Sequence, residues 1–267
     1  MSKLFFIGCG KMAGAIAGGV IRAGVLKPEE IAGFDVDSHS AESFEKISGA
    51  KVFTSDAKVH LADAETILIA VKPQMLESAL GCYKDILKDK AVFSIAAGVS
   101  IAKLKDVTGA QRIVRIMPNT PALVGCGAAA YTASSEARPE DVEFAGAIFS
   151  ALGLAVLLPE SSIDAVTALS GSGPAYVFEF IQALADGGVA EGLPRNIALQ
   201  LAVQTVIGSA KMVAETGEHP TQLKDNVTSP GGTTSRALEV MAERGFAGIV
   251  IQSVRAAAER SRELGGK

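Results

Sequence analysis

The chain has 267 residues, of which 20% are charged, and a formal net charge of −4, so its composition suggests neither a nucleic-acid partner nor a basic membrane-binding patch. The apolar run at residues 4–7 is too short for a secretory signal, and no apolar stretch reaches the roughly 18 residues that could span a bilayer. Three widely separated cysteines (Cys9, Cys82 and Cys126) fit reduced thiols better than a disulfide framework, and we therefore expect a soluble, cytoplasmic protein.

The first 160 residues alternate short apolar runs with helical patterns, which is typical of βαβ units around a parallel sheet. The predicted strands cover residues 4–7, 31–34, 51–53, 66–71, 91–95, 112–117, 128–132 and 155–158. The predicted helices between them cover residues 12–23, 41–47, 76–87 and 139–152. Ligands of such sheets bind outside the carboxyl ends of the strands, so we expect a site in the segments that follow these strands.

A glycine turn follows the first predicted strand directly, with the sequence Gly8-Cys9-Gly10-Lys11-Met12-Ala13. The first glycine permits a tight turn, and the second lets a pyrophosphate approach the backbone. The small third residue, Ala13, lets the next helix pack closely on the strand. With a second strand ahead, this order favours a dinucleotide site over a turn that binds nothing.

An acidic residue, Asp35, ends the second predicted strand. An acid at this point normally holds the ribose 2′-hydroxyl and favours NAD, because the 2′-phosphate of NADP would meet like charge. The alternative is that Asp35, Asp37 and Ser38 only cap the helix at 41–47. The residues leave both interpretations open.

Three later strand ends are rich in turn-forming residues, at 70–74, 96–99 and 117–121. Together with the glycine turn they predict a cofactor cleft along one edge of the sheet. A metal centre is not expected, because the three histidines (His39, His60 and His219) show no metal-ligand spacing. The sequence also has no GxSxG elbow and no Walker A loop.

After Pro159 the strand signals stop, and the second half is predicted to be all-helical. The helical patterns lie at 163–193, interrupted at 170–174, and then at 195–216, 237–243 and 249–264. Residues 196–210 carry no charge, and a helix this apolar is buried on every side. A domain of about 100 residues has little interior for it, so a subunit interface is expected to cover it. The alternative is a central helix inside a monomeric bundle.

Residues 225–236 form a loop that opens a helix, with Pro230, Gly231 and Gly232 at its centre. Five hydroxyl residues flank these positions: Thr228, Ser229, Thr233, Thr234 and Ser235. Free N–H groups at a helix N-terminus and the helix dipole suit an anion such as a carboxylate. Alone, the pattern is more typical of a capped helix start than of a site.

These motifs together resemble the pyrroline-5-carboxylate reductase family. The matching stretches are 6–13, 70–74, 115–121, 169–176, 186–189 and 227–234, in the family's order over nearly the whole chain. The resemblance implies an α/β protein with an N-terminal Rossmann-type doubly wound sheet (residues 1–160) followed by an all-helical substrate-binding and dimerisation domain (residues 161–267). It also implies hydride transfer from NADPH or NADH to the C=N bond of 1-pyrroline-5-carboxylate, which gives L-proline in the last step of proline biosynthesis.

The resemblance also implies roles for individual residues. The substrate carboxylate should be held by Ser229, Gly232, Thr233 and Thr234, and Thr234 should act as the catalytic residue by positioning the ring nitrogen. The cofactor-binding positions should be Gly8, Cys9, Gly10, Lys11, Met12, Ala13, Asp35, Asp56, Ala70, Val71, Lys72, Pro73, Ile95, Ala96, Ala97 and Asn119. Asn119 and the 170–174 turn should lie near the nicotinamide and the domain junction.

Asp35 and Asp56 depart from the family, which often has hydroxyl or amide residues at these positions. The acids favour NADH and the family favours NADPH, while Lys11 could offset part of the repulsion, so the choice of cofactor stays open. A hydroxyacid dehydrogenase would need an activating lysine, but the early candidate Lys211 has Glu215 one turn away and resembles a solvated pair. The alternative of a dinucleotide sensor without turnover is disfavoured by the loop at 229–234, because a sensor needs no carboxylate site.

Overall fold

The computed structural model describes residues 2–55 and 57–266. The chain divides into two compact units, one made of Met1–Ser172 with Ala257–Lys267 and the other of Gly173–Ala256. We call them the sheet unit and the helical unit. The expected domain boundary between residues 160 and 161 precedes the end of the compact sheet unit, and as a domain boundary it stays a prediction.

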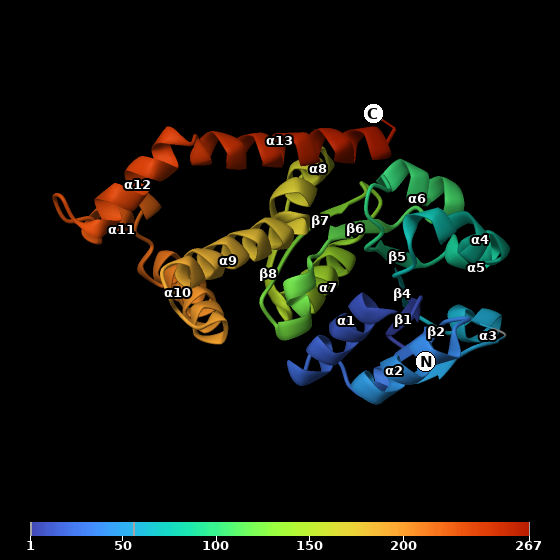
Figure 1. Ribbon diagram of the computed structural model, residues 1–267. Helices are drawn as coiled ribbons and strands as arrows, with labels where there is room; N and C mark the ends of the chain where they lie inside the picture. Colours follow the sequence, from blue (N-terminus) through green and yellow to red (C-terminus); the bar gives the residue numbers. More distant parts are fainter. Residues whose placement is uncertain (1, 56, 267) are drawn as a thin grey trace. The chain divides into compact units, whose positions relative to one another are not determined.

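The sheet unit is built on one eight-stranded sheet with the order β3-β2-β1-β4-β5-β6-β7-β8 (Figure 1). The strands are β1 (Leu4–Ile7), β2 (Ile31–Phe34), β3 (Lys51–Phe53), β4 (Thr66–Ile69), β5 (Ala91–Ser94), β6 (Ile113–Met117), β7 (Gly127–Ala133) and β8 (Gly153–Leu157). The order reverses between β1 and β4, which is the switch point where doubly wound sheets bind dinucleotides. The predicted Rossmann-type sheet is therefore confirmed.

The expected parallel sheet has one antiparallel pair of neighbours, β6 and β7. Residues 118–126 hold only a short 3-10 turn, Thr120–Val124, between these two strands. A connection this short suits antiparallel neighbours, whereas a parallel crossover needs a dozen or more residues. The turn-forming residues at 117–121 therefore lead the chain directly back to the neighbouring strand, and they do not begin a crossover helix.

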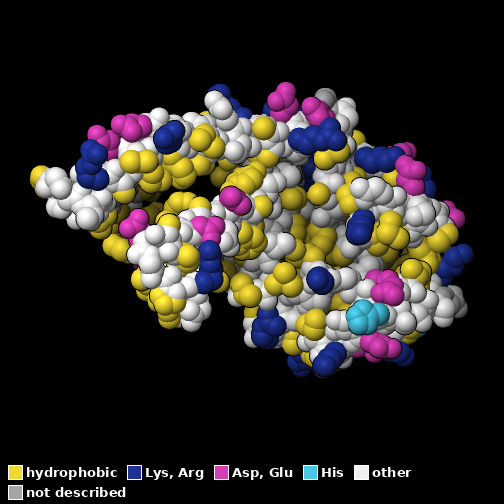
Figure 2. Space-filling model, in the orientation of Figure 1, with side chains coloured by type: hydrophobic (Ala, Val, Ile, Leu, Met, Phe, Trp, Pro, Cys, Tyr) yellow, Lys and Arg dark blue, Asp and Glu magenta, His cyan; other side chains and the backbone are white. Residues whose placement is uncertain are grey.

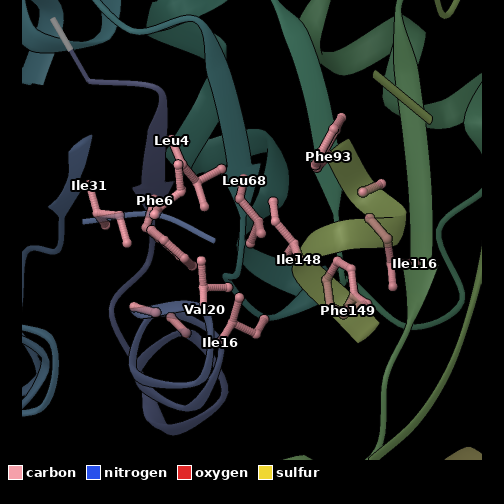
Figure 3. Close-up of a cluster of buried hydrophobic side chains, with 14 of the residues drawn as sticks. Leu4, Phe6, Ile16, Val20, Ile31, Leu68, Phe93, Ile116, Ile148 and Phe149 are labelled. Atoms are coloured by element: carbon pink, nitrogen blue, oxygen red, sulfur yellow. The ribbon is translucent and has the colours of Figure 1, made fainter. Parts of the chain in front are cut away.

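Two cores cover the two faces of the sheet, because alternate residues of a strand point to opposite faces. Leu4, Phe6 and Phe93 face α1 (Lys11–Arg22) and α7 (Pro139–Ser150), where Figure 3 shows their side chains with Ile16, Val20, Ile148 and Phe149. On the other face, Phe5, Ile7 and Ile67 meet side chains of α4 (Leu76–Leu80) and α6 (Ile101–Thr108). Burial of each such side chain contributes roughly 1.5–3 kcal/mol.

The other helices of the sheet unit are α2 (Ser38–Ser48), α3 (Ala57–Ala62), α5 (Lys84–Leu87) and α8 (Ile163–Val166). The single helix predicted at 76–87 is wrong, since a 3-10 turn, Gly81–Tyr83, separates α4 from α5. Glycine has a low helix propensity, which favours a break at Gly81. α3 and α6 were not predicted, although Ser100 caps α6 by accepting a hydrogen bond from the backbone N–H of Lys103 at 3.2 Å.

The helical unit contains α9 (Gly173–Ala190), α10 (Arg195–Thr216), α11 (Pro220–Asn226), α12 (Thr233–Glu243) and most of α13 (Phe246–Leu264). A π-helical turn, Thr167–Gly171, precedes α9 and overlaps the interruption predicted at 170–174, although α9 already begins at Gly173. α9 and α10 pack through small residues, and Ala185, Ala198 and Ala202 are buried between them. The last turns of α13 belong to the sheet unit, where the buried Ser261 hydroxyl donates to the Asp164 carboxylate at 2.9 Å.

α10 is long and apolar enough to cross a membrane by length and composition. The expectation that no stretch of the chain meets this criterion is therefore wrong for α10, although one such helix is weak evidence of a span. Only Ala198 and Ala202 of this helix are buried within the chain. Figure 2 shows hydrophobic side chains, in yellow, at the surface of the helical unit. The predicted all-round burial of α10 is not achieved within one chain.

Candidate functional site

The glycine turn lies between β1 and α1, at the carboxyl end of the sheet. Gly8 has a φ of 93°, and a Cβ at this position would lie 2.9 Å from the carbonyl carbon of Ala70 and from Cγ1 of Val71. Glycine is therefore required here both by backbone conformation and by the close approach of the segment after β4. The structure thus brings together two of the predicted cofactor-binding stretches, 8–13 and 70–73.

The N-terminus of α1 is open. Gly10 is the N-cap residue, and no side chain among the described residues caps the helix. A Cβ on Gly10 would meet no atom within 4 Å, so the backbone is accessible from outside. The N–H groups of the first turn, from Lys11 onward, have no intrahelical partners, and together with the helix dipole they form an anion site.

Asp35 holds this turn in place. One carboxylate oxygen, Oδ2, accepts a hydrogen bond from the backbone N–H of Cys9 at 2.7 Å, and Oδ1 accepts from the backbone N–H of Asp37 at 3.0 Å. The cap of α2 is instead Asp37, whose Oδ2 accepts from the backbone N–H of Ser40 at 2.9 Å. The interpretation of Asp35 as a cap of this helix is therefore wrong, and its carboxylate is fixed beside the glycine turn.

Cys9 takes part in the glycine turn through its backbone N–H and not through its thiol. Its side chain is buried, and a Cβ on Gly33 would lie 2.7 Å from its Sγ. Burial, together with the negative charges of Asp35 and Glu45, raises the pKa of the thiol to about 12. The thiol is therefore protonated at neutral pH and is no nucleophile.

A cavity of about 290 Å³ lies beside the turn, at the carboxyl ends of β1 and β2. Its lining is mostly apolar, with the Asp35 carboxylate as its charged group: Ile7, Gly8, Phe34, Asp35, Val36, Val71, Met75, Ser78, Ala79, Cys82 and Tyr83. Apolar walls beside a carboxylate suit a nucleoside, because the base packs on the walls and a hydroxyl can donate to the acid.

The lining residues between Met75 and Tyr83 were missed by the sequence analysis. Ser78, Ala79 and Cys82 lie on one face of the helical segment after β4, at positions i, i+1 and i+4. That spacing was visible in the sequence, but it is shared by every helix that packs on a core.

The remaining predicted cofactor residues lie at other strand ends. Ile95, Ala96 and Ala97 follow β5, and Asn119 follows β6. The Asn119 side chain is buried and already in use, since Nδ2 donates to the carbonyl of Ser170 at 3.1 Å and Oδ1 accepts from the backbone N–H of Ala128 at 2.9 Å. Its contact with the nicotinamide stays a prediction, and Asp56 lies outside the described residues.

The loop at 227–232 belongs to the helical unit and joins α11 to α12. The helix begins at Thr233, not at Ala237 as predicted, and Gly232 is its N-cap without a side-chain cap among the described residues. A turn closes on this point, because the backbone N–H of Gly232 donates to the carbonyl of Ser229 at 3.0 Å. Gly231 has a φ of 66°, which favours glycine.

Three of the five hydroxyls around the start of α12 are available for a ligand, while that of Thr228 donates to the carbonyl of Lys224 at 2.7 Å. A Cβ on Gly232 would lie 2.3 Å from Oγ of Ser229, so this hydroxyl lies directly beside the helix N-terminus. Within the described residues, the hydroxyls of Ser229, Thr233 and Thr234 have no hydrogen-bond partner, whereas Ser235 donates to the carbonyl of Gly232 at 3.2 Å. The loop therefore offers neutral donors and a positive helix end to an anion.

Within the part of the chain that the structure describes, no group of three or more His, Cys, Asp or Glu residues could hold a metal ion. The chemistry available is that of an open anion site beside an apolar cavity in one unit and a hydroxyl-rich helix start in the other.

Known proteins match nearly the whole chain. Residues 160–264 match the family described as pyrroline-5-carboxylate reductase dimerisation, and residues 3–98 match the family described as NADP oxidoreductase, coenzyme F420-dependent. A pyrroline-5-carboxylate reductase of Methanosarcina acetivorans is 46% identical over 99% of this chain and 98% of its own length.

Solved structures agree with this similarity. A pyrroline-5-carboxylate reductase from Coxiella burnetii has a TM-score of 0.92 at 35% identity, covering 98% of both chains. The pyrroline carboxylate reductase of Plasmodium falciparum, solved with NADP bound, has a TM-score of 0.88 at 35% identity, covering 99% of this chain and 98% of its own.

Proposed function

The chain belongs to the pyrroline-5-carboxylate reductase family, and from this premise we propose how its residues share the work of the reaction. The protein is an oxidoreductase of proline biosynthesis that uses NAD(P)H to reduce the C=N bond of 1-pyrroline-5-carboxylate to L-proline. One observation carries the proposal for the substrate: the uncapped N-terminus of α12 with free hydroxyls around it.

The substrate carboxylate binds at the start of α12 in this proposal. Backbone N–H groups from Thr233 onward donate to it, and the positive end of the helix dipole attracts it. The hydroxyls of Ser229 and Thr233 add two neutral donors beside the Gly232 turn. A carboxylate held by several N–H and O–H donors needs no arginine partner.

Thr234 positions the ring nitrogen. A protonated imine is already electrophilic, so the protein mainly has to align the hydride donor and the acceptor and to exclude water. Thr234 lies one position into α12 after Thr233, and its hydroxyl has no partner among the described residues. Its oxygen can accept a hydrogen bond from the iminium N–H, which fixes the ring relative to the cofactor.

The cofactor binds in the sheet unit. The open N-terminus of α1 at Gly10 fits a pyrophosphate, and the cavity of about 290 Å³ fits the adenosine end. The nicotinamide supplies the hydride when the cofactor is bound. In this proposal the segments after β4 and β5, including Ala70–Pro73 and Ile95–Ala97, line the path of the cofactor along the sheet edge.

The substrate proposal is tested by Thr234→Ala. We expect kcat/KM for pyrroline-5-carboxylate to fall on the order of a hundredfold, because a small misplacement of the ring costs about that factor. The dissociation constant of the dinucleotide, measured by fluorescence of the reduced cofactor, should not change. Thr234→Ser keeps the hydroxyl and is the matched control with most of the activity. Unchanged turnover in the alanine variant would remove Thr234 from the mechanism.

The choice of cofactor depends in our proposal on Asp35. Its carboxylate is fixed by the N–H groups of Cys9 and Asp37 at the wall of the cavity, so it cannot move away from a 2′-phosphate. A 2′-phosphate bound beside this carboxylate would therefore meet a charge of the same sign, and two unit charges about 4 Å apart repel by roughly 4 kcal/mol at an effective dielectric constant of about 20. Lys11 is exposed at the start of α1 and offsets part of this repulsion.

Replacement of Asp35 by Asn tests this proposal. Asn keeps an oxygen that can accept from Cys9 but removes the charge, and Asp35→Ser is a second variant that shortens the side chain. We expect the ratio of KM for NADPH to KM for NADH to fall on the order of tenfold, which corresponds to about 1.4 kcal/mol. If this ratio of KM values does not change, Asp35 holds the glycine turn and does not select the cofactor.

The cellular setting and the assembly complete the proposal. We place the enzyme in the cytoplasm, supported by Cys9, Cys82 and Cys126, which are all free thiols. The helical domain, residues 161–267, joins two copies into a homodimer, supported by the dimerisation family that matches residues 160–264. Neither nucleic acid nor a membrane is a partner in this scheme.

A further inference from the structure

The segment between β5 and α6, residues 95–100, depends on its neighbours to hold it in place. We call it the β5 loop. Its first five residues, Ile95-Ala96-Ala97-Gly98-Val99, carry no polar side-chain atom, so contacts from other segments decide how firmly it is held. It follows a strand at the carboxyl end of the sheet, on the path that the proposed function gives to the cofactor.

Glu160 holds one end of the β5 loop. Its Oε1 accepts a hydrogen bond from the backbone N–H of Ile101 at 2.8 Å and another from Nη1 of Arg115 at 3.1 Å. Ile101 is the first residue of α6, and the side chain of Arg115 in β6 is only 4% exposed. Hydrogen bonds that involve charged groups are stronger than neutral ones, so Glu160 fixes the end of the loop to the sheet.

The end of α13 covers the middle of the β5 loop, and both belong to the sheet unit. A Cβ on Gly98 would lie 3.8 Å from Cβ of Leu264, and a Cβ on Gly265 would lie 3.5 Å from the carbonyl oxygen of Gly98. Both distances are within van der Waals contact. The backbone of the loop therefore packs directly against the C-terminal end of α13.

A buried hydrogen bond fixes this end of α13. The Ser261 hydroxyl donates to Oδ1 of Asp164 at 2.9 Å, and each of the two residues is only 5% exposed. Leu264 and Gly265 follow Ser261 within about one helical turn, so the bond lies beside the contact with the β5 loop. Asp164 comes four residues after Glu160, and this one short segment therefore holds the loop both directly and through α13.

We propose that Ser261 is a positioning residue for the cofactor. Its bond to Asp164 keeps the end of α13 against Gly98, and the β5 loop thereby keeps the conformation that receives the dinucleotide. Ser261 does not touch the dinucleotide and acts through the loop. A segment that is ordered in advance loses less freedom when a ligand binds, so the dissociation constant is lower. This role rests on the proposed function, which puts the cofactor along residues 95–97.

The first test is Ser261→Ala, which removes the hydrogen-bond donor and suits a helix, because alanine has the highest helix propensity. We expect the dissociation constant of the reduced dinucleotide, measured by its fluorescence, to rise about tenfold, since a hydrogen bond to a charged group contributes at least that factor. KM for the dinucleotide should rise by a similar factor, while kcat at saturating dinucleotide stays close to that of the unmodified chain. A residue with only a structural role would lower the unfolding temperature and leave the dissociation constant and KM unchanged.

Ser253→Ala is the matched control on the same helix. The Ser253 hydroxyl donates to the carbonyl of Ile249 at 2.9 Å, within α13 itself. This variant should bind the dinucleotide as tightly as the unmodified chain does. Equal dissociation constants in the two alanine variants would overturn the proposal, and so would a change in kcat alone. Far-ultraviolet circular dichroism confirms that both variants are folded.

Hydrogen exchange tests the order of the β5 loop without any dinucleotide. The backbone N–H groups of Ala96 and Ile101 donate hydrogen bonds near the two ends of the loop, so their exchange reports how often it opens. Both should exchange faster in Ser261→Ala than in Ser253→Ala, and equal exchange in the two variants would overturn the proposal. Dinucleotide binding and turnover by the unmodified chain are measured separately, so that a failure of the proposed function is distinguished from a failure of this contact.

Discussion

The two compact units of the chain differ in how completely they bury their large apolar side chains. The sheet unit hides large ones completely, among them Phe5, Phe6 and Phe93. In the helical unit, the buried residues among those described are alanines of α9 and α10, while Phe178 is 63% exposed. The sheet unit thus completes its core within one chain, and we infer that the helical unit completes its own only with a second copy.

The largest effect should come from the sheet core. Phe93→Ala is expected to lower the free energy of unfolding by about 3–5 kcal/mol, because it leaves a cavity between the sheet and α7. Phe178→Ala is the matched control in the helical unit, and it should change the unfolding of the monomer by far less. Urea unfolding at two protein concentrations checks both, and equal losses in the monomer would contradict the contrast between the units.

A second effect should appear in α10, where Leu201 is exposed. Leu201→Lys is expected to weaken association by roughly 1.5–3 kcal/mol per copy, the value of burying such a side chain. The unfolding temperature of the variant should then be lower at every concentration at which the unmodified chain is associated, because stabilisation by a binding partner falls as the dissociation constant rises. Differential scanning calorimetry over a concentration series measures this, and an unfolding temperature that does not change with concentration in either protein would contradict a shared core.

The smallest effect concerns an ion pair in the sheet unit. Burial alone would raise the pKa of Asp141, but hydrogen bonds from the Arg112 guanidinium and from the backbone N–H of Arg138 lower it below the ordinary carboxyl value. A lowered folded-state pKa stabilises the fold above the unfolded value of about 3.9, and this contribution is lost as the pH falls through the folded pKa.

Asp141→Asn should therefore lower the free energy of unfolding by about 1.5 kcal/mol near neutral pH. The difference between the variant and the unmodified chain should shrink when the pH is well below about 3.9. Urea unfolding at both pH values checks this, and the loss should not depend on protein concentration, because both partners lie in the sheet unit. A difference that is the same at both pH values would contradict the role of the charge.

Local signals predicted much of the sheet. β1, β2 and β3 have the predicted bounds, because each is a short run closed by glycine or by polar residues. The antiparallel β7 was not foreseen, since strand direction depends on how the chain returns and not on the strand's own residues. The contact of Ser261 with Asp164 joins residues far apart in the sequence and leaves no local pattern.

Local sequence signals also predicted only part of the candidate site. The glycine turn and the loop before α12 were predicted, because special backbone conformations require glycine at Gly8 and Gly231. The bond between Asp35 and Cys9 was missed, since a carboxylate after a strand gives the same sequence pattern whether it caps a helix or holds a turn. The wall of the cavity at Ser78 and Cys82 was missed because its spacing is that of any packed helix.

The central claim is the reduction itself, and one assay tests it most directly. The purified chain is mixed with L-pyrroline-5-carboxylate and either NADPH or NADH, and both the loss of reduced cofactor and the formation of proline are quantified. We predict that one proline forms for each reduced cofactor consumed. Cofactor binding without any proline from either dinucleotide would contradict the account and leave the loop before α12 without its substrate.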